Sequence, residues 1–586
     1  MAGASISQPL RFAKQREPKM PYRAPVTDIR FILDHVVGFA EVAATDRFSA
    51  ATPDLAEAIL TEAGRLSTEV LAPLNRVGDQ HGARLENGII ISSPGFAEGY
   101  RAIAQGGWVG MAASPEHGGM GLPISVTLGV DDMMSGACLA LQIKPLLSKG
   151  QIEALEHHAS DALKALYLPK LTSGEWSGTM NLTEPQAGSD VGALRTKAVP
   201  NADGTFAISG QKIYISWGDS DLTSNVCHLV LARLPDGAEG TKGISLFMVP
   251  KFIPDAEGRP GGRNSLRVVS LEHKLGIHGS PTCVMEYTGA RGWLVGEPHK
   301  GMAAMFTMMN NARLSVAAQG VGIAEAALQH ALAYAEGRHQ GATPLAADGP
   351  ILDHADVRRM LATARAEVFA ARSIALACAK AIDMATATGN PEWQSRAALL
   401  TPIAKAYGTD VACEVSGIGV QVHGGMGFVE ETGAAQFLRD ARILPIYEGT
   451  NGIQAMDLVG RKLADGGEAA FRLIDEVQRG AEEGRARMPD LAGEVWAAAE
   501  ALREGTEAVL ALPLNDRFAG AVPYLRAFAR VLGGQAHLKA ALADPDRVAL
   551  ARVMVRRLLP ELPGLLAQAK EGAAGLYEVG SGDLAA

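Results

Sequence analysis

"GTFAISGQKIYISWG" at residues 204–218 is the stretch that decides the fold class, because its periodicity differs from that of the sequence on either side. Its apolar and polar residues alternate, which is typical of a half-buried β-strand. Ser209 and Gly210 indicate a turn between two short runs. Three further runs rich in Val, Ile and Phe follow, separated by clusters of Gly, Pro and Asp. An all-β segment is therefore predicted here.

The sequence on both sides of this segment has the periodicity of helices. Before it, residues 54–78 carry apolar side chains at spacings of three and four. After it, Val321, Ala324, Leu328 and Ala331 fall on one face of a long predicted helix. The predicted fold class is α+β, with an N-terminal helical domain, a middle β domain, a C-terminal four-helix bundle and a helical extension. The expected boundaries are 1–25 for a tail, then 26–175, 176–300, 301–462 and 463–586 for the four domains.

Composition restricts the class of protein. A chain of 586 residues is too long for one core, and its net charge of -10 argues against nucleic acid as a partner. Five scattered cysteines without a C-x-x-C pair indicate reduced thiols rather than a disulfide framework or a metal site. We expect no integral membrane segment and a cytoplasmic protein. The first 25 residues lack a secretory signal and are expected to be a disordered tail; alternatively, the true start of the protein is Met20.

Nucleotide-binding signatures of the Rossmann and P-loop types are missing from the sequence, so any nucleotide cofactor must be held in another way. Three other stretches stand out: "MNLTEPQAGSDVG" at residues 180–192, "GQKIYISWG" at residues 210–218, and "QVHGGMGF" at residues 421–428. The second places Tyr214 and Ser216 on one face of a strand. Each stretch, taken alone, is ordinary turn chemistry.

Glu448 follows the apolar residues of "RDARILPIYEGT" at residues 439–450. In one interpretation it is a solvated loop residue, and Thr450 or Asn451 is the N-cap of the helix that follows. In the other it is a catalytic base in an apolar pocket, where desolvation raises its pKa toward neutrality. This segment alone leaves both interpretations open.

The joint order of these stretches resembles the acyl-CoA dehydrogenases, from about Val26 to Arg461. "TEPQAGSD" and "GQKIYIS" resemble the flavin-side motifs of that family. "QVHGGMGF" resembles its cofactor loop, and "RDARILPIYEGT" resembles its catalytic segment. The resemblance implies an FAD enzyme that converts an acyl-CoA thioester to a trans-2-enoyl-CoA, with helical, β and helical domains.

The resemblance also implies a role for individual residues. Glu448 would be the catalytic base that removes the α-proton, while a hydride leaves the β-carbon. FAD would be bound by Met180, Leu182, Thr183, Ser189, Tyr214, Ser216, Arg338, Gln421, Gly424, Gly425 and Thr450. The acyl-CoA would be contacted by Ser189, Arg313, Tyr447 and Gly449. Within the cofactor-binding set, Arg338, Gln421, Gly424 and Gly425 are expected to meet the flavin of a neighbouring subunit.

The extension after Arg461 resembles that of the longer family members, which implies a homodimer. Electron-transferring flavoprotein is the expected electron acceptor. "YRAPVTDIRF" and "YEGTNGIQA" most resemble the bacterial members that oxidise 3-methylmercaptopropionyl-CoA to methylthioacryloyl-CoA in dimethylsulfoniopropionate degradation. The alternatives are a fatty acyl-CoA dehydrogenase of β-oxidation, an acyl-CoA oxidase, or a non-enzymatic scaffold with the same fold.

Overall fold

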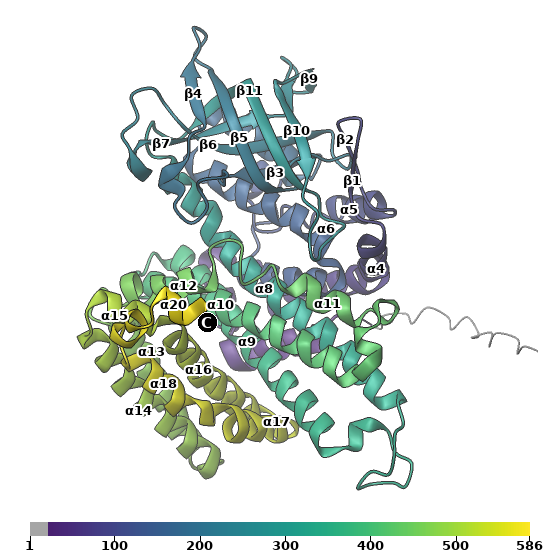
Figure 1. The fold of residues 1–586 in the computed structure, drawn as a ribbon, viewed down its shortest axis with the longest axis vertical. Helices are drawn as coiled ribbons and strands as arrows, with labels where there is room; N and C mark the ends of the chain where they lie inside the picture. Colours follow the sequence, from purple (N-terminus) through teal and green to yellow (C-terminus); the bar gives the residue numbers. More distant parts are fainter. Residues whose placement is uncertain (1–21, 586) are drawn as a thin grey trace, which may run out of the picture.

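The chain is organised as a β domain between two helical regions, followed by a helical extension (Figure 1). This computed structural model describes residues 22–585, apart from the side chains of residues 310 and 311. The β domain lies at one end of the molecule and the extension lies at the other (Figure 1). The α+β fold class predicted from the sequence is confirmed.

One long helix, α6 (Ile124–His158), forms the centre of the N-terminal helical region. By length and composition alone, this helix is apolar enough to cross a membrane. However, 94% of its most apolar window is buried inside the protein, so it is a core helix. The region also contains α1 (Val26–Phe31), α2 (Ala40–Ala43), α3 (Pro53–Leu66), α4 (Ala72–Gln80), β1 (Arg84–Glu86), β2 (Ile89–Ile91), α5 (Phe96–Gln105) and α7 (Asp161–Thr172).

The start of the described chain is packed against the helices. Tyr22 is buried, and its hydroxyl donates a hydrogen bond to the carbonyl of Met133 at 2.8 Å. The backbone N–H of Arg23 donates to Oε1 of Gln329, also at 2.8 Å. Residues 22–25 therefore do not behave as the disordered tail expected from the sequence. The rest of that tail, with the alternative start at Met20, lies outside the described residues.

The middle domain is a seven-stranded sheet in which β7 pairs with both β6 and β11. This double pairing closes β11, β5, β4, β6 and β7 into a small barrel, whose interior is a separate apolar core. Strands β3 and β10 extend the sheet at either end, and β8 and β9 form a separate ribbon. The strands are β3 (Trp176–Asn181), β4 (Lys197–Pro200), β5 (Phe206–Ser216), β6 (Asn225–Arg233), β7 (Ile244–Pro250), β8 (Phe252–Pro254), β9 (Pro260–Arg263), β10 (Leu266–Leu271) and β11 (Thr282–Val295).

The turn predicted at Ser209 and Gly210 is wrong, because both residues lie inside the continuous strand β5. Ser209 pairs with Thr288 and Gly210 pairs with Tyr287 on β11. Glycine is needed at position 210 for a different reason. A Cβ atom there would lie 2.5 Å from Oγ1 of Thr196, which is closer than van der Waals contact allows. The glycine signal marks a close approach within a sheet, which local sequence does not distinguish from a turn.

The C-terminal bundle is formed mainly by three long helices, α8 (Gly301–Gly337), α9 (Ala355–Thr388) and α10 (Pro391–His423). The apolar face predicted for α8 is buried, with Val321, Ala324, Leu328 and Ala331 each at most 5% exposed. Two short helices, α11 (Ala434–Ala441) and α12 (Asn451–Asp457), follow the bundle and flank the segment that contains Glu448.

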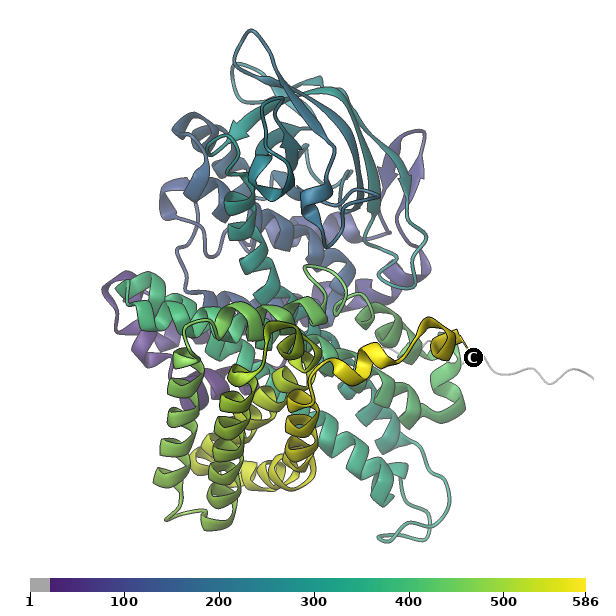
Figure 2. The same ribbon diagram turned by 60° about the vertical axis from the view of Figure 1, so that its left-hand side comes forward.

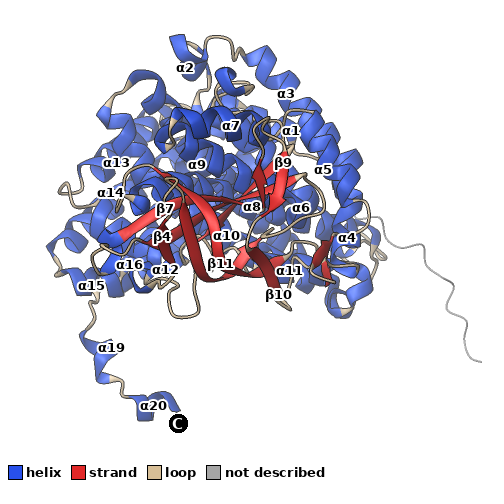
Figure 3. Cartoon of the chain, turned by 90° about the horizontal axis from the view of Figure 1, so that it is seen from above, coloured by secondary structure: helices blue, strands red, loops and turns tan. Residues whose placement is uncertain are grey.

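The extension packs against α9 and α10 on the side of the bundle away from the β domain (Figure 2). Its helix α16 carries Arg530, which is buried and forms an ion pair with Glu367 of α9 at 2.6 Å. The last two helices project away from the body of the protein (Figure 3). The extension contains α13 (Glu468–Gly484), α14 (Pro489–Ala511), α15 (Leu514–Ala519), α16 (Ala521–Ala543), α17 (Val548–Val553), α18 (Leu562–Lys570), α19 (Ala574–Glu578) and α20 (Ser581–Ala585).

Candidate functional site

Glu448 lies on a reversal of the backbone between α11 and α12. Its φ angle is 56°, and that of Gly449 is 86°, so two consecutive residues are left-handed. A non-glycine residue in this region costs about 1 kcal/mol or more and persists only where the surroundings impose it. Thr450 is the N-cap of α12, and its side chain accepts a hydrogen bond from Ile453 N at 3.2 Å. The helix start that one interpretation of the sequence expected is therefore present, with its N-cap two residues after Glu448.

The carboxylate of Glu448 has a pKa near neutral pH. Its Oε2 atom is buried and has no hydrogen-bond partner among the described residues. Burial raises the pKa of Glu448 to about 7, because the charged form loses hydration. The positive charges of Arg313 and Lys405 act in the opposite direction and keep the pKa from rising further. A carboxylate with this pKa is suited to accept a proton near pH 7.

Lys405 of α10 fixes the loop that carries Glu448. Its Nζ donates to the carbonyl of Gly449 and to Oδ1 of Asn451, both at 2.9 Å. Burial lowers the pKa of Lys405 to about 8, while the charge of Glu448 opposes that shift. The sequence analysis missed this lysine. The sequence feature that could have identified it is a single cationic residue within the apolar run of residues 402–407.

Arg313 of α8 approaches the same site from another direction. Its side chain is only 7% exposed, and its NH1 lies 3.8 Å from Oδ2 of Asp457 in α12. Burial lowers the pKa of Arg313, while Asp457 and Glu448 raise it. The structure thus brings Arg313 and Glu448 together, although 135 residues separate them in the sequence.

A chain of polar side chains runs from Tyr447 to α6. The hydroxyl of Tyr447 donates to Oε1 of Gln319 in α8. Nε2 of Gln319 then donates to Oε1 of Gln142 at 2.9 Å. Nε2 of Gln142 is buried and has no hydrogen-bond partner among the described residues. An unsatisfied buried amide is costly, so this group is available to an acceptor brought by a ligand. Neither glutamine was singled out from the sequence.

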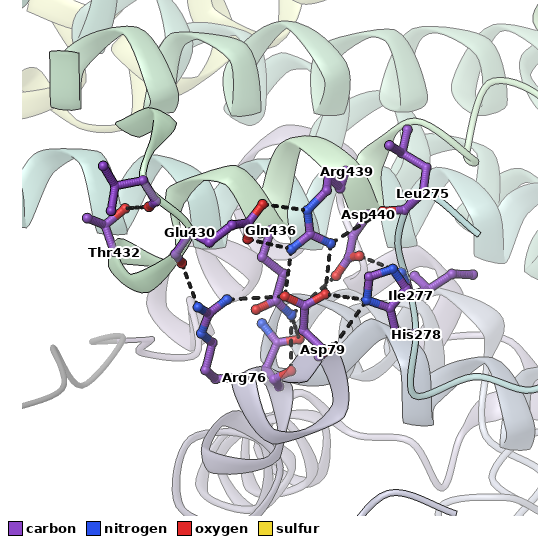
Figure 4. A network of polar contacts seen from close by, with 12 residues as sticks. Arg76, Asp79, Leu275, Ile277, His278, Glu430, Thr432, Gln436, Arg439 and Asp440 are labelled. Carbon is purple, nitrogen blue, oxygen red and sulfur yellow. Dashed lines mark hydrogen bonds and ion pairs between the residues drawn. The ribbon is translucent and has the colours of Figure 1, made fainter. Parts of the chain in front are cut away.

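Arg439 and Asp440, which open the Glu448 segment, have a positioning role (Figure 4). The guanidinium of Arg439 donates to both carboxylate oxygens of Asp79 in α4, at 2.8 and 2.6 Å, and to Glu430 at 2.9 Å. The carboxylate of Asp440 accepts a hydrogen bond from Ile277 N at 2.5 Å. These contacts hold α11 against the N-terminal helices and against the loop before β11. They fix the direction from which the chain enters the site.

The two flavin-side motifs are joined by a buried ion pair that the sequence analysis did not assign. Nζ of Lys212 in β5 lies 2.8 Å from Oε1 of Glu184, and both side chains are at most 3% exposed. Burial lowers the pKa of Lys212 to about 8, while its charge holds the pKa of Glu184 at about 2. The carbonyl of Thr183 also accepts a hydrogen bond from Ile213 N at 2.9 Å. The sequence contained a signal for this ion pair, because Lys212 is a charged residue at a core-facing position of the alternating strand.

The strand alternation that would place Tyr214 and Ser216 on one side of β5 is interrupted at Tyr214. Tyr214 has a φ angle of 60° at an irregularity in the pairing with β11, and its side chain is 61% exposed. Ser216 is half-buried, and Ile215 between them is buried. Strand β3 and the loop after it carry the other residues of this group, with Leu182 buried, Met180 and Thr183 half-buried and Ser189 exposed. An open aromatic side chain beside polar groups fits the face of a planar ring such as a flavin.

Four predicted cofactor residues lie elsewhere. Arg338 follows the end of α8, 25 residues after Arg313, which corresponds to about 37 Å of helix. Gln421, Gly424 and Gly425 lie at the end of α10, where His423 stacks on Tyr334 of α8 with ring centroids 4.3 Å apart. All four are exposed, and a Cβ at either glycine would meet no atom within 4 Å. Within one chain these residues form a group separate from Glu448.

Comparison with known proteins gives consistent matches along the chain. Its consecutive parts match families described as acyl-CoA dehydrogenase N-terminal domain, middle domain and C-terminal domain, and acetyl-CoA dehydrogenase C-terminal like, at residues 56–175, 179–290, 299–463 and 473–579. The chain is 48% identical to 3-methylmercaptopropionyl-CoA dehydrogenase of Ruegeria pomeroyi, over 86% of this chain and 88% of that protein. It is 36% identical to the broad-specificity linear acyl-CoA dehydrogenase FadE5 of Mycobacterium tuberculosis, over 79% of each chain. The fold is similar to that of ACDH-11 of Caenorhabditis elegans in complex with C11-CoA, with a TM-score of 0.78 and 19% identity over 95% of this chain and 94% of that one.

Proposed function

The chain belongs to the acyl-CoA dehydrogenase family of FAD-dependent oxidoreductases, and on that premise we propose that Glu448 is its catalytic base and 3-methylmercaptopropionyl-CoA its substrate. The observation that carries the assignment of the base is the buried, unpartnered Oε2 of Glu448, with a pKa of about 7. A solvated loop carboxylate would keep a pKa near 4.3 and would be almost fully ionised and hydrated.

Glu448 removes the α-proton of the bound thioester in this proposal. An α-proton beside a thioester is weakly acidic, so the negative charge that develops on the carbonyl oxygen needs fixed donors. Among the described residues, no acceptor is found for the backbone N–H of Glu448, which leaves this donor available to that oxygen. Lys405 holds the left-handed turn at Glu448 and Gly449, and in this proposal the turn directs this N–H and the carboxylate to the same thioester.

FAD would be held on the β-domain side by Met180, Leu182, Thr183, Ser189, Tyr214 and Ser216, and on the Glu448 side by Thr450. When bound, FAD supplies the hydride acceptor for the β-carbon of the substrate. The half-buried and exposed side chains along β3 and β5 support this assignment, because they offer an open surface next to the Glu184–Lys212 pair. The chain's own residues orient the ring and exclude water from the α-carbon.

We assign the CoA thioester contacts to Ser189, Arg313, Tyr447 and Gly449. Arg313 is buried beside Glu448, so its charge would attract an anionic ligand while moderating the pKa of the base. Gly449 is followed by the N-cap of α12 and has a φ angle of 86°, which favours glycine at this position.

Arg338, Gln421, Gly424 and Gly425 would contact the FAD of a second subunit in a homodimer. Two observations support this assignment. The four residues lie far along α8 and α10 from the site of their own chain. The adjoining loop also exposes large apolar side chains, with Phe428 89% and Met426 45% exposed, which a partner subunit would cover.

The proposed substrate rests on the 48% identity to the Ruegeria pomeroyi enzyme and on the polar chain beside the base. We propose that Nε2 of Gln142, which is buried without a partner among the described residues, faces the acyl group, where a sulfur atom can accept a weak hydrogen bond and a long alkyl chain cannot. A dehydrogenase of linear fatty acyl-CoA substrates is the second candidate, favoured by the 36% identity to FadE5. We further propose electron-transferring flavoprotein as electron acceptor and a cytoplasmic location.

The test is anaerobic mixing of the purified holoenzyme with acyl-CoA substrates while the flavin absorbance is followed. Pentanoyl-CoA is the matched comparison, because it replaces the sulfur of 3-methylmercaptopropionyl-CoA with a methylene group. Faster bleaching by the sulfur compound supports the proposed substrate. Equal or faster bleaching by pentanoyl- or palmitoyl-CoA would instead favour the fatty acyl-CoA candidate.

Two controls complete this test. Glu448→Gln should retain FAD and slow bleaching by about 10²–10⁴-fold, the range expected for loss of a general base. Unchanged bleaching in this variant would refute the assignment of the base. Rapid reoxidation of the reduced enzyme by oxygen alone would point to an oxidase, and a purified protein without flavin would point to a scaffold.

A further inference from the structure

A cavity of about 290 Å³ lies where the extension meets the helical bundle and the N-terminal helices. Residues of α9, α10, α13 and α16 line it, together with the N-terminal residues 36, 37 and 41. We propose that this cavity binds a small organic anion, an aliphatic carboxylate, which joins the extension to the rest of the protein.

The charges in the wall favour an anion. Three cationic side chains, Lys380, Arg396 and Lys539, face two carboxylates, Glu41 and Glu476, which leaves one positive charge in excess. Each carboxylate already has a cation at 2.6 Å: Lys380 pairs with Glu41, and Arg396 pairs with Glu476. Lys539 lies farther from Glu476, at 3.5 Å. Lys539 is therefore the cation with most capacity for an additional negative group.

Two residues of the cavity wall also carry buried hydrogen-bond donors that have no partner among the described residues. Nε2 of Gln535 is buried and has no partner among the described residues, and the whole residue is only 7% exposed. Nε of Arg396 is likewise buried without a partner in the described part of the chain. Buried donors without acceptors are unfavourable, so two of them on residues that line one cavity favour a ligand that accepts hydrogen bonds. A carboxylate has the charge and the acceptor atoms that these groups require.

The rest of the wall is apolar, which favours a carboxylate that carries a hydrocarbon chain over an inorganic anion. Ile374 and Ala377 of α9, Leu400 of α10, Leu473 of α13 and Leu532 of α16 contribute to it. At about 30 Å³ for each water in the liquid, the volume corresponds to roughly ten water-sized groups. A short aliphatic acid fits this size, and an acyl-CoA does not.

This cavity is distinct from the site of Glu448. Arg396 and Lys405 are both on α10, nine residues apart. At 100° for each residue, they point in directions about 180° apart. Lys405 faces the Glu448 loop, whereas Arg396 faces the extension, where its NH1 pairs with Glu476 of α13. A ligand in the cavity would therefore be separated from the reacting groups by the helix α10.

The test is isothermal titration calorimetry of the holoenzyme with hexanoate, with inorganic phosphate at equal ionic strength, and with the neutral analogue hexanol. We expect one hexanoate to bind per chain, more tightly than either comparison compound. Gln535→Met keeps the shape of the side chain and removes its donors, so it should weaken hexanoate binding about tenfold or more. Gln535→Glu adds a negative charge and should abolish binding. Gln568→Met, at an exposed position on α18, is the matched control and should bind as the unaltered protein does.

The outcomes separate this cavity from the acyl site. Flavin bleaching by acyl-CoA should be unchanged in Gln535→Met, and an unchanged melting temperature would show that the variant is folded. Three results would overturn the proposal: no binding of hexanoate at millimolar concentration, equal binding of phosphate, or hexanoate binding that is insensitive to both changes at Gln535. The last result would place the hexanoate elsewhere, for example where the acyl chain binds.

Discussion

The pH dependence of flavin reduction tests the environment of Glu448 directly. Burial raises the pKa of this carboxylate to about 7. Only the ionised form can accept the α-proton, so the rate should rise with pH as Glu448 loses its own proton. At pH 6 about 9% of the free enzyme carries the ionised base, and at pH 8 about 91% does. The expected gain between these two values is therefore about tenfold.

The appropriate quantity is the second-order rate constant for bleaching, obtained by stopped flow at low substrate concentration. This constant reports the pKa of the free enzyme, whereas the rate at saturating substrate reports the complex, in which further loss of water shifts the pKa. The logarithm of this rate constant, plotted against pH, should rise with unit slope up to about pH 7 and become level above it. A profile that is flat from about pH 5.5 to 8.5, or that breaks near the ordinary glutamate value, would refute the reasoning.

A substitution at Lys405 gives a second check on the same argument. Lys405→Met removes a positive charge that lowers the pKa of Glu448, so the break in the profile should move to higher pH. The same change removes the hydrogen bonds to Gly449 and Asn451, so the plateau rate should fall as well. Arg442→Met is a suitable control, because Arg442 is exposed and does not contribute to the pKa of Glu448. A profile for Lys405→Met that breaks at or below the original pH would contradict the proposed electrostatics.

Three further predictions concern the elements around the site. Lys212→Met should lower the free energy of unfolding by about 3–5 kcal/mol in urea denaturation, because it leaves Glu184 buried without its cation; adding Glu184→Gln should recover part of the loss. Arg439→Ala should cost about 1.5–3 kcal/mol, the range for charged hydrogen bonds, and should increase FAD loss on gel filtration; full retention would contradict the positioning role. Tyr447→Phe, which loses the hydrogen bond to Gln319, should lower the ratio of kcat/KM for 3-methylmercaptopropionyl-CoA to that for pentanoyl-CoA. An unchanged ratio would show that the polar chain does not determine specificity.

The sequence by itself determined the order of the domains and the position of the Glu448 segment. Period-two alternation at residues 204–218 and helical spacing on both sides are local properties, so they predicted the α+β class correctly. The start of α12, whose N-cap is Thr450, was also predictable to within one residue, because an N-cap is a local hydrogen-bonding arrangement. At Gly210 the same local approach failed, since the close contact comes from Thr196, the residue just before β4.

Only the tertiary structure decided what Glu448 is able to do. Its pKa depends on burial and on the charges of Arg313 and Lys405, which come from two helices distant in the sequence. Its backbone conformation depends on a hydrogen bond from Lys405 to Gly449. The cavity beside the extension likewise exists only where five separate segments meet. Local patterns specify elements, whereas electrostatics and burial are sums over residues that folding brings together.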